Sequence, residues 1–205
     1  MSEYVWYASY GSNINEERFL SYITGGVPNG SMVKERGCRD KSLPKDSKKI
    51  FLPYPMFFAM SSARWEQKGV CFIEAFTQEN QQTLGKMYQI TKEQFCDVVS
   101  QENNMDKLEI NFNELDRVGS VIISKKKFYG KIIRVGFDKG KPIYTFTSPN
   151  PISEYRAPAL SYLKVIAHGI KETYGLEEQE IIRYLLQRAE VRNEYTTEIL
   201  QGLFC

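Results

Sequence analysis

The side chain best placed to carry a proton is the carboxylate of Glu102. The predicted helix 92–102 bears an apolar stripe at helical spacing, formed by Phe95, Val98 and Val99. Glu102 continues this stripe at the last position of the helix. Burial raises the pKa of a carboxylate, and so does the negative end of a helix dipole, so such a group exchanges protons nearer neutral pH. The alternative is that the helix ends earlier and Glu102 is a solvated loop residue.

A second candidate is the tetrapeptide Tyr10-Gly11-Ser12-Asn13, between a predicted buried strand and a predicted helix start. Consecutive backbone N–H groups at such a turn form a concave site for a carboxylate or a phosphate, because the helix has not yet begun to pair them. Glycine at the second position lets a ligand approach the backbone closely. The alternative is an ordinary turn from strand to helix with an N-cap.

The composition leaves few other catalytic designs. The single histidine, His168, lies among apolar residues of a predicted helix and is more readily explained as structural, so designs with a histidine base have little support. The four cysteines are far apart and have no histidine spaced to join them, which predicts reduced, mostly buried thiols and no metal site. They are Cys38, Cys71, Cys96 and Cys205. P-loop and dinucleotide motifs are absent from the sequence, so we expect no cofactor.

Length and charge indicate the class of protein. The 205 residues, 42% of them hydrophobic, suit one domain with a sizeable core. The 27 Lys and Arg residues against 25 Asp and Glu residues give a formal net charge of +2, which makes nucleic acid a poor partner. Since no apolar run reaches the length of a membrane span and the start lacks a signal-peptide pattern, we expect no membrane partner and a cytoplasmic location.

Periodicity predicts the elements that position the candidates. Residues 4–10 form an aromatic and β-branched run, which predicts a buried strand. A helix capped by Asn13 or Asn15 follows and ends by Gly25-Gly26. The middle of the chain is strand-rich apart from a solvated loop over 41–49. The predicted strands there are 31–36, 55–61, 69–76 and 83–90.

The second half of the chain begins with the helix 92–102, for which Thr91 and Gln94 stand at capping-box spacing. Residues 103–127 are polar and irregular, and a hairpin around Asp138-Lys139-Gly140 follows. The remaining elements are predicted as strands 128–136 and 142–148 and helices 154–173, closed by Gly175, 177–190 and 193–202. The fold class is α+β, with a mixed or antiparallel sheet and a helical C-terminal third packed on it.

Several segments, taken in order, resemble the γ-glutamylcyclotransferase family. Residues 7–14, Tyr-Ala-Ser-Tyr-Gly-Ser-Asn-Ile, resemble its N-terminal strand and YGSN loop. Residues 69–73 and 84–90 look like the paired strands that lead to its catalytic helix, and Gln101-Glu102 falls where its catalytic glutamate is expected. The further matches are Phe128-Tyr129, Ser153-Glu154-Tyr155, His168-Gly169 and Tyr174-Gly175-Leu176. Together these matches cover most of residues 4–176.

The resemblance implies a small mixed β-barrel or sheet with flanking helices, and the release of 5-oxoproline from a γ-glutamyl amide without a metal or a cofactor. The α-amine of the substrate attacks its own γ-carbonyl, and Glu102 carries the proton from that amine to the leaving amine. The resemblance assigns substrate binding to Tyr10, Gly11, Ser12 and Asn13 in the loop and to Tyr129 and Tyr155 as walls and hydroxyl donors.

We expect one domain over 1–205, with a core of about 4–176 and a helical extension of about 177–205. The segment 103–127 is longer than the connector of compact family members, so Tyr129 is matched across an insertion. The extension could cap the pocket or form the contact of a homodimer. The expected partner is a small-molecule γ-glutamyl substrate, which could be glutathione, a γ-glutamyl amino acid, a γ-glutamylamine or a larger metabolite. The alternative function is a non-catalytic binding module for γ-glutamyl or other carboxylate metabolites.

Overall fold

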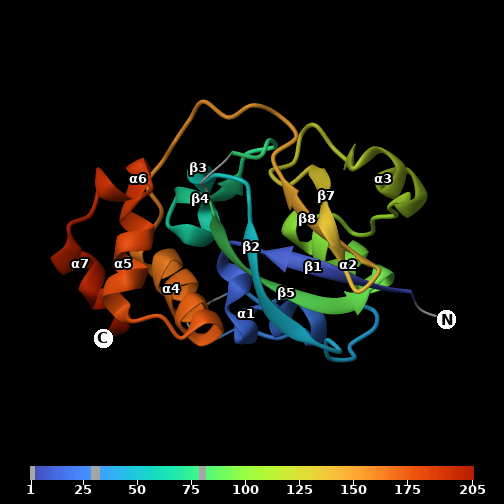
Figure 1. Ribbon diagram of the computed structural model, residues 1–205, viewed down its shortest axis with the longest axis horizontal. Coiled ribbons are helices and arrows are strands. Elements are labelled where there is room, and N and C mark those ends of the chain that lie inside the picture. The colour runs from blue at the N-terminus through green and yellow to red at the C-terminus, as the bar shows by residue number, and fades with distance from the viewer. Residues whose placement is uncertain (1–2, 29–32, 79–81) are drawn as a thin grey trace. The chain divides into compact units, whose positions relative to one another are not determined.

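The computed structural model describes residues 3–28, 33–78 and 82–205 (Figure 1). The chain forms two compact units, each built from three stretches of sequence. The first unit contains residues 1–9, 17–50 and 86–151, and the second contains 10–16, 51–85 and 152–205. Whether they act as one domain, as expected from the sequence, stays a prediction.

A six-stranded sheet forms most of the first unit, in the order β2-β5-β1-β8-β7-β6. Its strands are β1 (Tyr4–Ser9), β2 (Ser47–Leu52), β5 (Thr83–Thr91), β6 (Ser120–Ile122), β7 (Lys131–Asp138) and β8 (Lys141–Thr147). Strand β1 is antiparallel to β5 and parallel to β8, and β7 is antiparallel to both of its neighbours. The sheet is therefore mixed and mainly antiparallel, which confirms the predicted α+β class.

The described sheet is open, so the barrel in our prediction is wrong. Closure needs the two edge strands to pair, and β2 and β6 stand at opposite ends of the strand order. Strand β6 has only three residues, which leaves little backbone for a further strand to pair with.

One hydrophobic cluster packs the helices of the first unit against this sheet. These helices are α1 (Glu16–Thr24), α2 (Lys92–Glu102) and α3 (Phe112–Val118). The cluster joins alternate residues of β1 to the apolar stripes of α1 and α2 and includes Val5, Tyr7, Phe19, Ile23, Tyr88, Phe95, Val98, Val99, Leu115 and Tyr144. The hairpin between β7 and β8 turns at Lys139 and Gly140, both at positive φ, as a two-residue turn requires.

The second unit combines a strand pair with the C-terminal helices. Strands β3 (Met56–Ser62) and β4 (Lys68–Ile73) are antiparallel. The helices are α4 (Leu160–Tyr174), α5 (Glu178–Leu186), α6 (Ala189–Arg192) and α7 (Thr197–Gln201), with short 3-10 turns η1 (Ser12–Ile14), η2 (Ala63–Trp65) and η3 (Gly202–Phe204). Helix α4 packs on η1, α5 and η3. It ends at Tyr174 and is closed by Gly175, as predicted, with this glycine in the left-handed conformation.

The structure corrects several element boundaries. Strand β2 begins inside the predicted loop 41–49, and the irregular segment 103–127 contains α3 and β6. Of the predicted strand 31–36, residues 31 and 32 lie outside the described residues, and the rest forms only an isolated bridge from Glu35 to Gly26.

The C-terminal helices are shorter than the periodicity predicts. Helix α4 begins at Leu160 rather than 154, because Tyr155 and Pro158 bridge to β3 and β4 in extended conformation. The predicted helix 177–190 contains α5, which ends at Leu186, and the start of the separate short helix α6. Of the predicted helix 193–202, only residues 197–201 are α-helical, as α7.

Candidate active site

Helix α2 extends through Glu102, so the alternative that it ends earlier is wrong. The capping box predicted for Thr91 and Gln94 is present in both directions, which fixes the first turn of the helix. The Phe95 and Val99 side chains are fully buried. Glu102 is the last helical residue and is partly buried, so its carboxylate lies at the negative end of the helix dipole.

The residue after Glu102 holds Tyr129 by its main chain. The side-chain amide of Asn103 donates to the Tyr129 carbonyl at 3.1 Å, and its oxygen accepts from the Tyr129 N–H at 3.1 Å. The same amide also donates to the Val99 carbonyl inside α2 at 3.0 Å. The buried Asn103 therefore brings Tyr129 to the end of the helix that carries Glu102.

Close backbone packing fixes the strand entry that follows Tyr129. A Cβ at Gly130 would lie 1.8 Å from the Ser124 carbonyl oxygen, so no larger residue fits there without a backbone shift. The Gly130 carbonyl accepts from the N–H of Ile123 at 2.8 Å. The Tyr129 ring packs edge-on against Phe146, with 5.5 Å between the ring centroids. Asn103 and Gly130 are positioning residues that the sequence analysis did not single out.

In the second unit, the Tyr10–Asn13 loop leads directly into the turn η1. The first bond of this turn joins the Ile14 N–H to the Gly11 carbonyl at 3.0 Å. Tyr10 and Asn13 are buried, whereas Gly11 and Ser12 are partly exposed. The predicted anion loop is thus anchored by its first and last side chains and reaches solvent at its middle.

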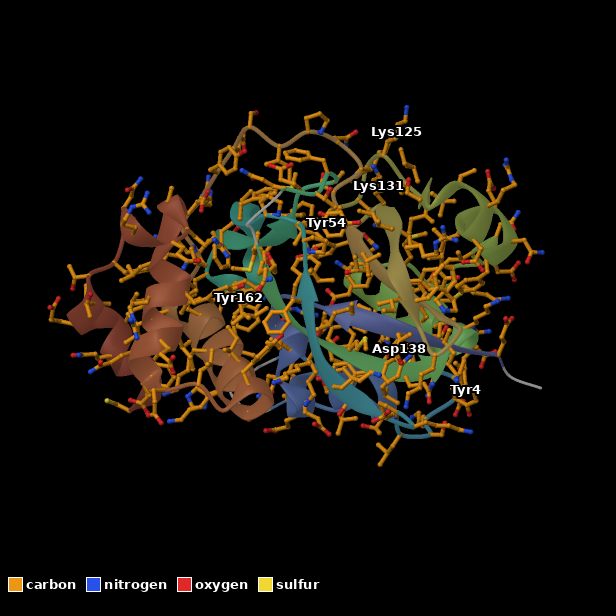
Figure 2. The ribbon with its side chains drawn as sticks, viewed as in Figure 1. Tyr4, Tyr54, Lys125, Lys131, Asp138 and Tyr162 are labelled. Carbon is orange, nitrogen blue, oxygen red and sulfur yellow. The ribbon has the colours of Figure 1, made fainter. Side chains whose placement is uncertain are left out.

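The Gly11 backbone lies close to two residues of the second unit. A Cβ at Gly11 would stand 3.0 Å from the Tyr162 hydroxyl and 3.4 Å from the Cys71 Cβ. The Tyr162 hydroxyl accepts from the Cys71 N–H at 3.3 Å, and the Cys71 thiol donates to the Tyr10 carbonyl at 3.7 Å. Tyr162, labelled in Figure 2, lies on α4 and therefore links that helix to the loop.

A glycine of α4 brings this helix against η1. A Cβ at Gly169 would lie 2.4 Å from the Asn15 nitrogen and 2.7 Å from the Ile14 carbonyl carbon, both backbone atoms. The Asn15 side chain also donates to the Glu172 carboxylate at 3.3 Å. The resemblance singled out Gly169, and the structure supplies a physical reason for glycine at this position.

Tyr155 lies on the extended strap before α4 and is 54% exposed. It bridges to Ala59 of β3, and its ring packs edge-on against Phe57 at 5.5 Å. The single histidine, His168, contacts the Leu203 carbonyl through Nε2 at 3.0 Å and stacks on Phe204, as expected of a structural histidine.

The seven predicted site residues divide between the two units. Glu102 and Tyr129 belong to the first unit, where Asn103 links them. Tyr155 and the loop Tyr10-Gly11-Ser12-Asn13 belong to the second. Their roles in substrate binding and catalysis stay predictions.

All four cysteines are free, and three of them are buried as predicted. Burial raises the pKa of the Cys38 thiol to about 12, with the Asp97 charge adding to the effect, and burial also raises the pKa of the Cys71 thiol. Within the described ranges, no group of three or more His, Cys, Asp and Glu side chains is arranged to hold a metal ion. No helix among the described residues is both long and apolar enough to span a membrane.

Comparisons with known proteins find similarity both in sequence and in structure. No protein-family profile matches the chain. It is 34% identical over 198 residues to histone deacetylase 5 of Arabidopsis thaliana, in an alignment that covers 88% of this chain and 30% of that protein. The chain thus spans less than a third of the length of this relative.

Two solved structures align with almost the whole chain. One is a γ-glutamyl cyclotransferase, with a TM-score of 0.51, 17% identity and coverage of 98% of this chain and 99% of that one. The other is a protein from Homo sapiens described as uncharacterized, with a TM-score of 0.53, 18% identity and coverage of 99% of both chains. At these identities the similarity concerns the fold alone. The chain has the fold of a γ-glutamyl cyclotransferase, which confirms the fold that the resemblance in the sequence implies.

Proposed function

We propose that the chain is a γ-glutamyl cyclotransferase that needs no cofactor. The α-amine of a γ-glutamyl amide attacks the γ-carbonyl, so a carbon–nitrogen bond forms within the substrate and the bond to the leaving amine breaks. The proton lost by the attacking amine goes to the leaving amine, and the products are 5-oxoproline and a free amine. Because nucleophile and electrophile belong to one molecule, holding the substrate folded supplies much of the rate.

The observation that carries this proposal is the position of Glu102 in a chain of this fold. Its carboxylate lies at the last residue of α2, partly buried and at the negative end of the helix dipole. A carboxylate is a type of group that can take up and release a proton during a reaction. In the proposed mechanism, Glu102 takes a proton from the α-ammonium, whose usual pKa is about 8, and returns one to the leaving amine.

The other predicted residues bind and fold the substrate in this proposal. The N–H groups of Gly11, Ser12 and Asn13 hold a carboxylate or polarise an oxygen, and Tyr10 shapes the same site. Tyr129 and Tyr155 serve as walls and hydroxyl donors. The fixed main chain of Tyr129 and the close packing around Gly11 support these roles, because a rigid site loses less entropy when it orders a flexible substrate.

The proposal is tested by incubating the purified chain with a panel of γ-glutamyl amides and measuring 5-oxoproline. The panel contains glutathione, γ-glutamyl amino acids and γ-glutamyl alkylamines. We expect release from at least one class, and the best leaving amine identifies the substrate. A folded protein that releases no 5-oxoproline from any member would contradict the proposal.

The second candidate is a non-catalytic module that binds γ-glutamyl or other carboxylate metabolites. The similarity to one segment of a protein named as a histone deacetylase favours it, because a domain within a larger protein can serve as a ligand sensor. Binding of γ-glutamyl compounds without turnover would support this candidate. We do not propose deacetylase activity for this chain, because the alignment covers only 30% of the protein that is named as a histone deacetylase. A cytoplasmic location and a homodimer stay predictions.

A further inference from the structure

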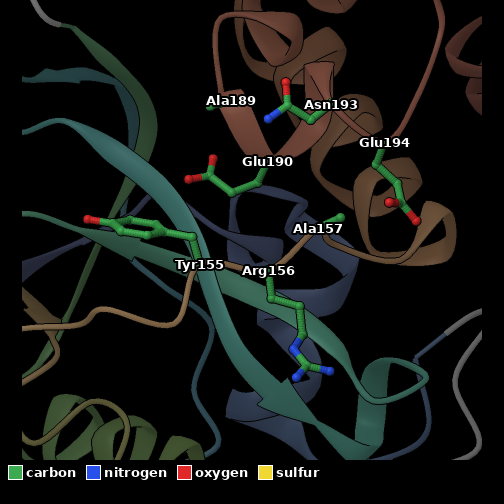
Figure 3. A pocket seen from close by; sticks show the side chains of 7 residues that line it. All are labelled: Tyr155, Arg156, Ala157, Ala189, Glu190, Asn193 and Glu194. Atoms are coloured by element: carbon green, nitrogen blue, oxygen red, sulfur yellow. The ribbon is translucent and has the colours of Figure 1, made fainter.

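The cavity shown in Figure 3 has a lining of mixed charge. It has a volume of about 510 Å³ and lies within the second unit. Arg156 lines it together with Glu190 and Glu194, so the lining selects neither a cation nor an anion. A surface of a single sign lies in the first unit instead, on the loop between β6 and β7.

This loop carries four lysines and no acidic residue. They are Lys125, Lys126, Lys127 and Lys131, in the segment 124–131, the lysine loop. Lys125 and Lys126 are exposed and the other two are partly buried; Lys125 and Lys131 are labelled in Figure 2. The four charges exceed the formal net charge of +2, so the rest of the chain is net negative. Within residues 3–28, 33–78 and 82–205, none of these lysines forms an ion pair.

Hydrogen bonds and close packing hold the main chain of the lysine loop. The Asn150 side chain donates to the Lys125 carbonyl at 2.8 Å, and the Lys126 N–H donates to the Ser124 hydroxyl at 3.2 Å. The Ser124 N–H donates to the Gly130 carbonyl at 3.3 Å, where the two backbones approach too closely for a Cβ. A ligand that binds here therefore has only the lysine side chains to order, which lowers the entropic cost of binding.

The lysine loop also contains Tyr129, which hydrogen bonds hold at the end of α2. The Lys127 ammonium donates to the Asn104 carbonyl at 3.4 Å, so a further contact joins the loop to the residues that follow Glu102. Consecutive Cα atoms are about 3.8 Å apart, so the Cα atoms of Lys126 and Tyr129 lie within about 11 Å of each other. Because charges act over about 10 Å in 0.1 M salt, a ligand at Tyr129 is within reach of the lysines.

We propose that the lysine loop binds the leaving group of an acidic γ-glutamyl peptide, in which the residues after the γ-glutamyl group carry more than one side-chain carboxylate. The inference rests on the proposed function in one respect: the acidic peptide is the leaving group of the cyclisation. A lysine ammonium has three donors on a flexible stem, so several lysines adapt to carboxylates at unequal spacing.

The length and charge of such a peptide match the surface. Two residues of extended peptide span about 7 Å, which is comparable with the reach from Tyr129 to the lysine charges. A single carboxylate cannot engage four unpaired lysines, whereas an acidic peptide presents one at each residue. The lysine loop therefore distinguishes an acidic leaving group from a neutral one of the same shape.

The first test compares γ-glutamyl-glutamyl-glutamate with γ-glutamyl-glutaminyl-glutamine, which have similar shapes and differ in two side-chain charges. Since an exposed ion pair contributes about threefold, we expect kcat/KM to be about tenfold higher for the acidic peptide at low salt. Lys125→Gln combined with Lys126→Gln should bring the ratio to within about twofold. So should salt of about 1 M, which screens charges beyond about 3 Å.

The matched control removes two exposed lysines at the opposite end of α2, by Lys41→Gln combined with Lys45→Gln. Gln94, in the first turn of this helix, donates to the carbonyls of the residues on either side of Lys41. The net charge changes equally, and this control should keep the preference. Equal kcat/KM for the two peptides, or a preference lost equally in both double variants, would overturn the proposal.

The second test needs no turnover and therefore separates the lysine loop from the proposed function. Backbone amide chemical shifts of the whole chain are followed by NMR while triglutamate or triglutamine is added at low salt. We expect triglutamate alone to shift the amides of 124–131, and Lys125→Gln with Lys126→Gln to weaken its binding about tenfold. This result without 5-oxoproline release would support the acidic-peptide site and reject the proposed function.

Three results would reject the acidic-peptide site even in an active cyclotransferase. One is the absence of triglutamate-induced shifts in 124–131, and another is equal shifts with triglutamine. The third is an oligonucleotide that shifts the same amides at a lower concentration than triglutamate does, which would assign the lysine loop to nucleic acid.

Discussion

The end of α2 and the Tyr10–Asn13 loop are both predicted to form the site, but they are held by different physical means. Side-chain hydrogen bonds fix the end of α2: Asn103 bonds to the Tyr129 main chain, and Gln101 donates to the Tyr22 carbonyl and accepts from the Gly37 N–H. Close approach fixes the loop, because Gly11 and Gly169 leave no room for a Cβ without movement of a neighbour. Hydrogen bonds therefore position the end of α2, and close packing around glycine positions the loop.

This difference predicts how each region responds to mutation. A hydrogen-bonded position loses about 1–3 kcal/mol when a buried partner is left unsatisfied, whereas its geometry survives isosteric exchange. A close-packed glycine tolerates no added atom where the neighbour is backbone. Mutations at the end of α2 can therefore change activity without changing stability. Mutations at Gly169 of α4, which packs against η1 and so supports the Tyr10–Asn13 loop, are expected to change activity and stability together.

The largest expected effect is on chemistry at the end of α2. Glu102→Gln keeps the shape of the side chain and removes its proton exchange, so we expect kcat to fall about 10³-fold with little change in substrate affinity. Glu93→Gln makes the same change at the exposed first turn of α2 and should retain activity. Steady-state kinetics and calorimetric substrate binding check both. Equal activity of Glu102→Gln and wild type would remove Glu102 from the mechanism.

The next effect concerns the stability of the loop's support. Alanine normally stabilises a helix over glycine by about 1 kcal/mol, but at Gly169 the added Cβ meets backbone atoms of Ile14 and Asn15. We expect Gly169→Ala to lower the free energy of unfolding by about 3 kcal/mol, measured by urea denaturation. Gly202→Ala, which meets no atom within 4 Å, is the matched control and should be nearly neutral. Similar free energies of unfolding for the two variants would show that the close approach of the backbone at Gly169 is not what destabilises Gly169→Ala.

A smaller effect is expected at the hydrogen-bonded anchor. Asn103→Ala leaves the Tyr129 N–H and carbonyl without their side-chain partner, so we expect a loss of about 2 kcal/mol of stability. Tyr129→Phe keeps both main-chain bonds and removes only the hydroxyl. We expect Tyr129→Phe to retain most of the stability and to lower turnover if the hydroxyl contacts the substrate. Equal destabilisation by the two variants would contradict the anchoring role of Asn103.

The smallest effect is a pH dependence of stability. Burial raises the pKa of the Cys38 thiol from 9.0 to about 12, so the folded state holds this proton more tightly than the unfolded state does. The resulting stabilisation is fully present below pH 9 and is lost as the pH rises toward 12. At pH 10 we expect a loss of about 1 kcal/mol relative to pH 8, and Cys38→Ala should reduce this slope. An unchanged slope in Cys38→Ala would assign the effect to other groups.

Local signals in the sequence predict α2 and the β7–β8 hairpin well. The Thr91 capping box and the Phe95 stripe act within a few residues, and the positive φ of Lys139 and Gly140 is a property of the turn itself. The strand β2 lacks such a signal. Its residues Ser-Lys-Lys-Ile-Phe-Leu are mostly exposed, as suits an edge strand that carries lysine, and they read as a loop by composition.

The positioning residues of the candidate site depend on distant partners, so the sequence did not reveal them. Asn103 bonds to a residue 26 positions away, and the need for glycine at Gly130 comes from the Ser124 carbonyl. Helix α3 was missed because its buried residue, Leu115, packs into the core cluster without a long apolar stripe of its own. Glu102 was found because it is a carboxylate at a position of the apolar stripe of α2. Asn103 lies outside that stripe, so no local pattern marks it.

The central claim is that the substrate's own amine, and not water, attacks the γ-carbonyl. The most direct measurement follows the products of an active γ-glutamyl amide in ¹⁸O-labelled water by mass spectrometry, with the N-acetylated amide as a second substrate. If the amine attacks, we expect equal amounts of 5-oxoproline and free amine, no ¹⁸O in the 5-oxoproline and no reaction of the N-acetylated substrate. Formation of ¹⁸O-labelled glutamate, or cleavage of the N-acetylated amide, would show that water attacks and that the chain is not a cyclotransferase.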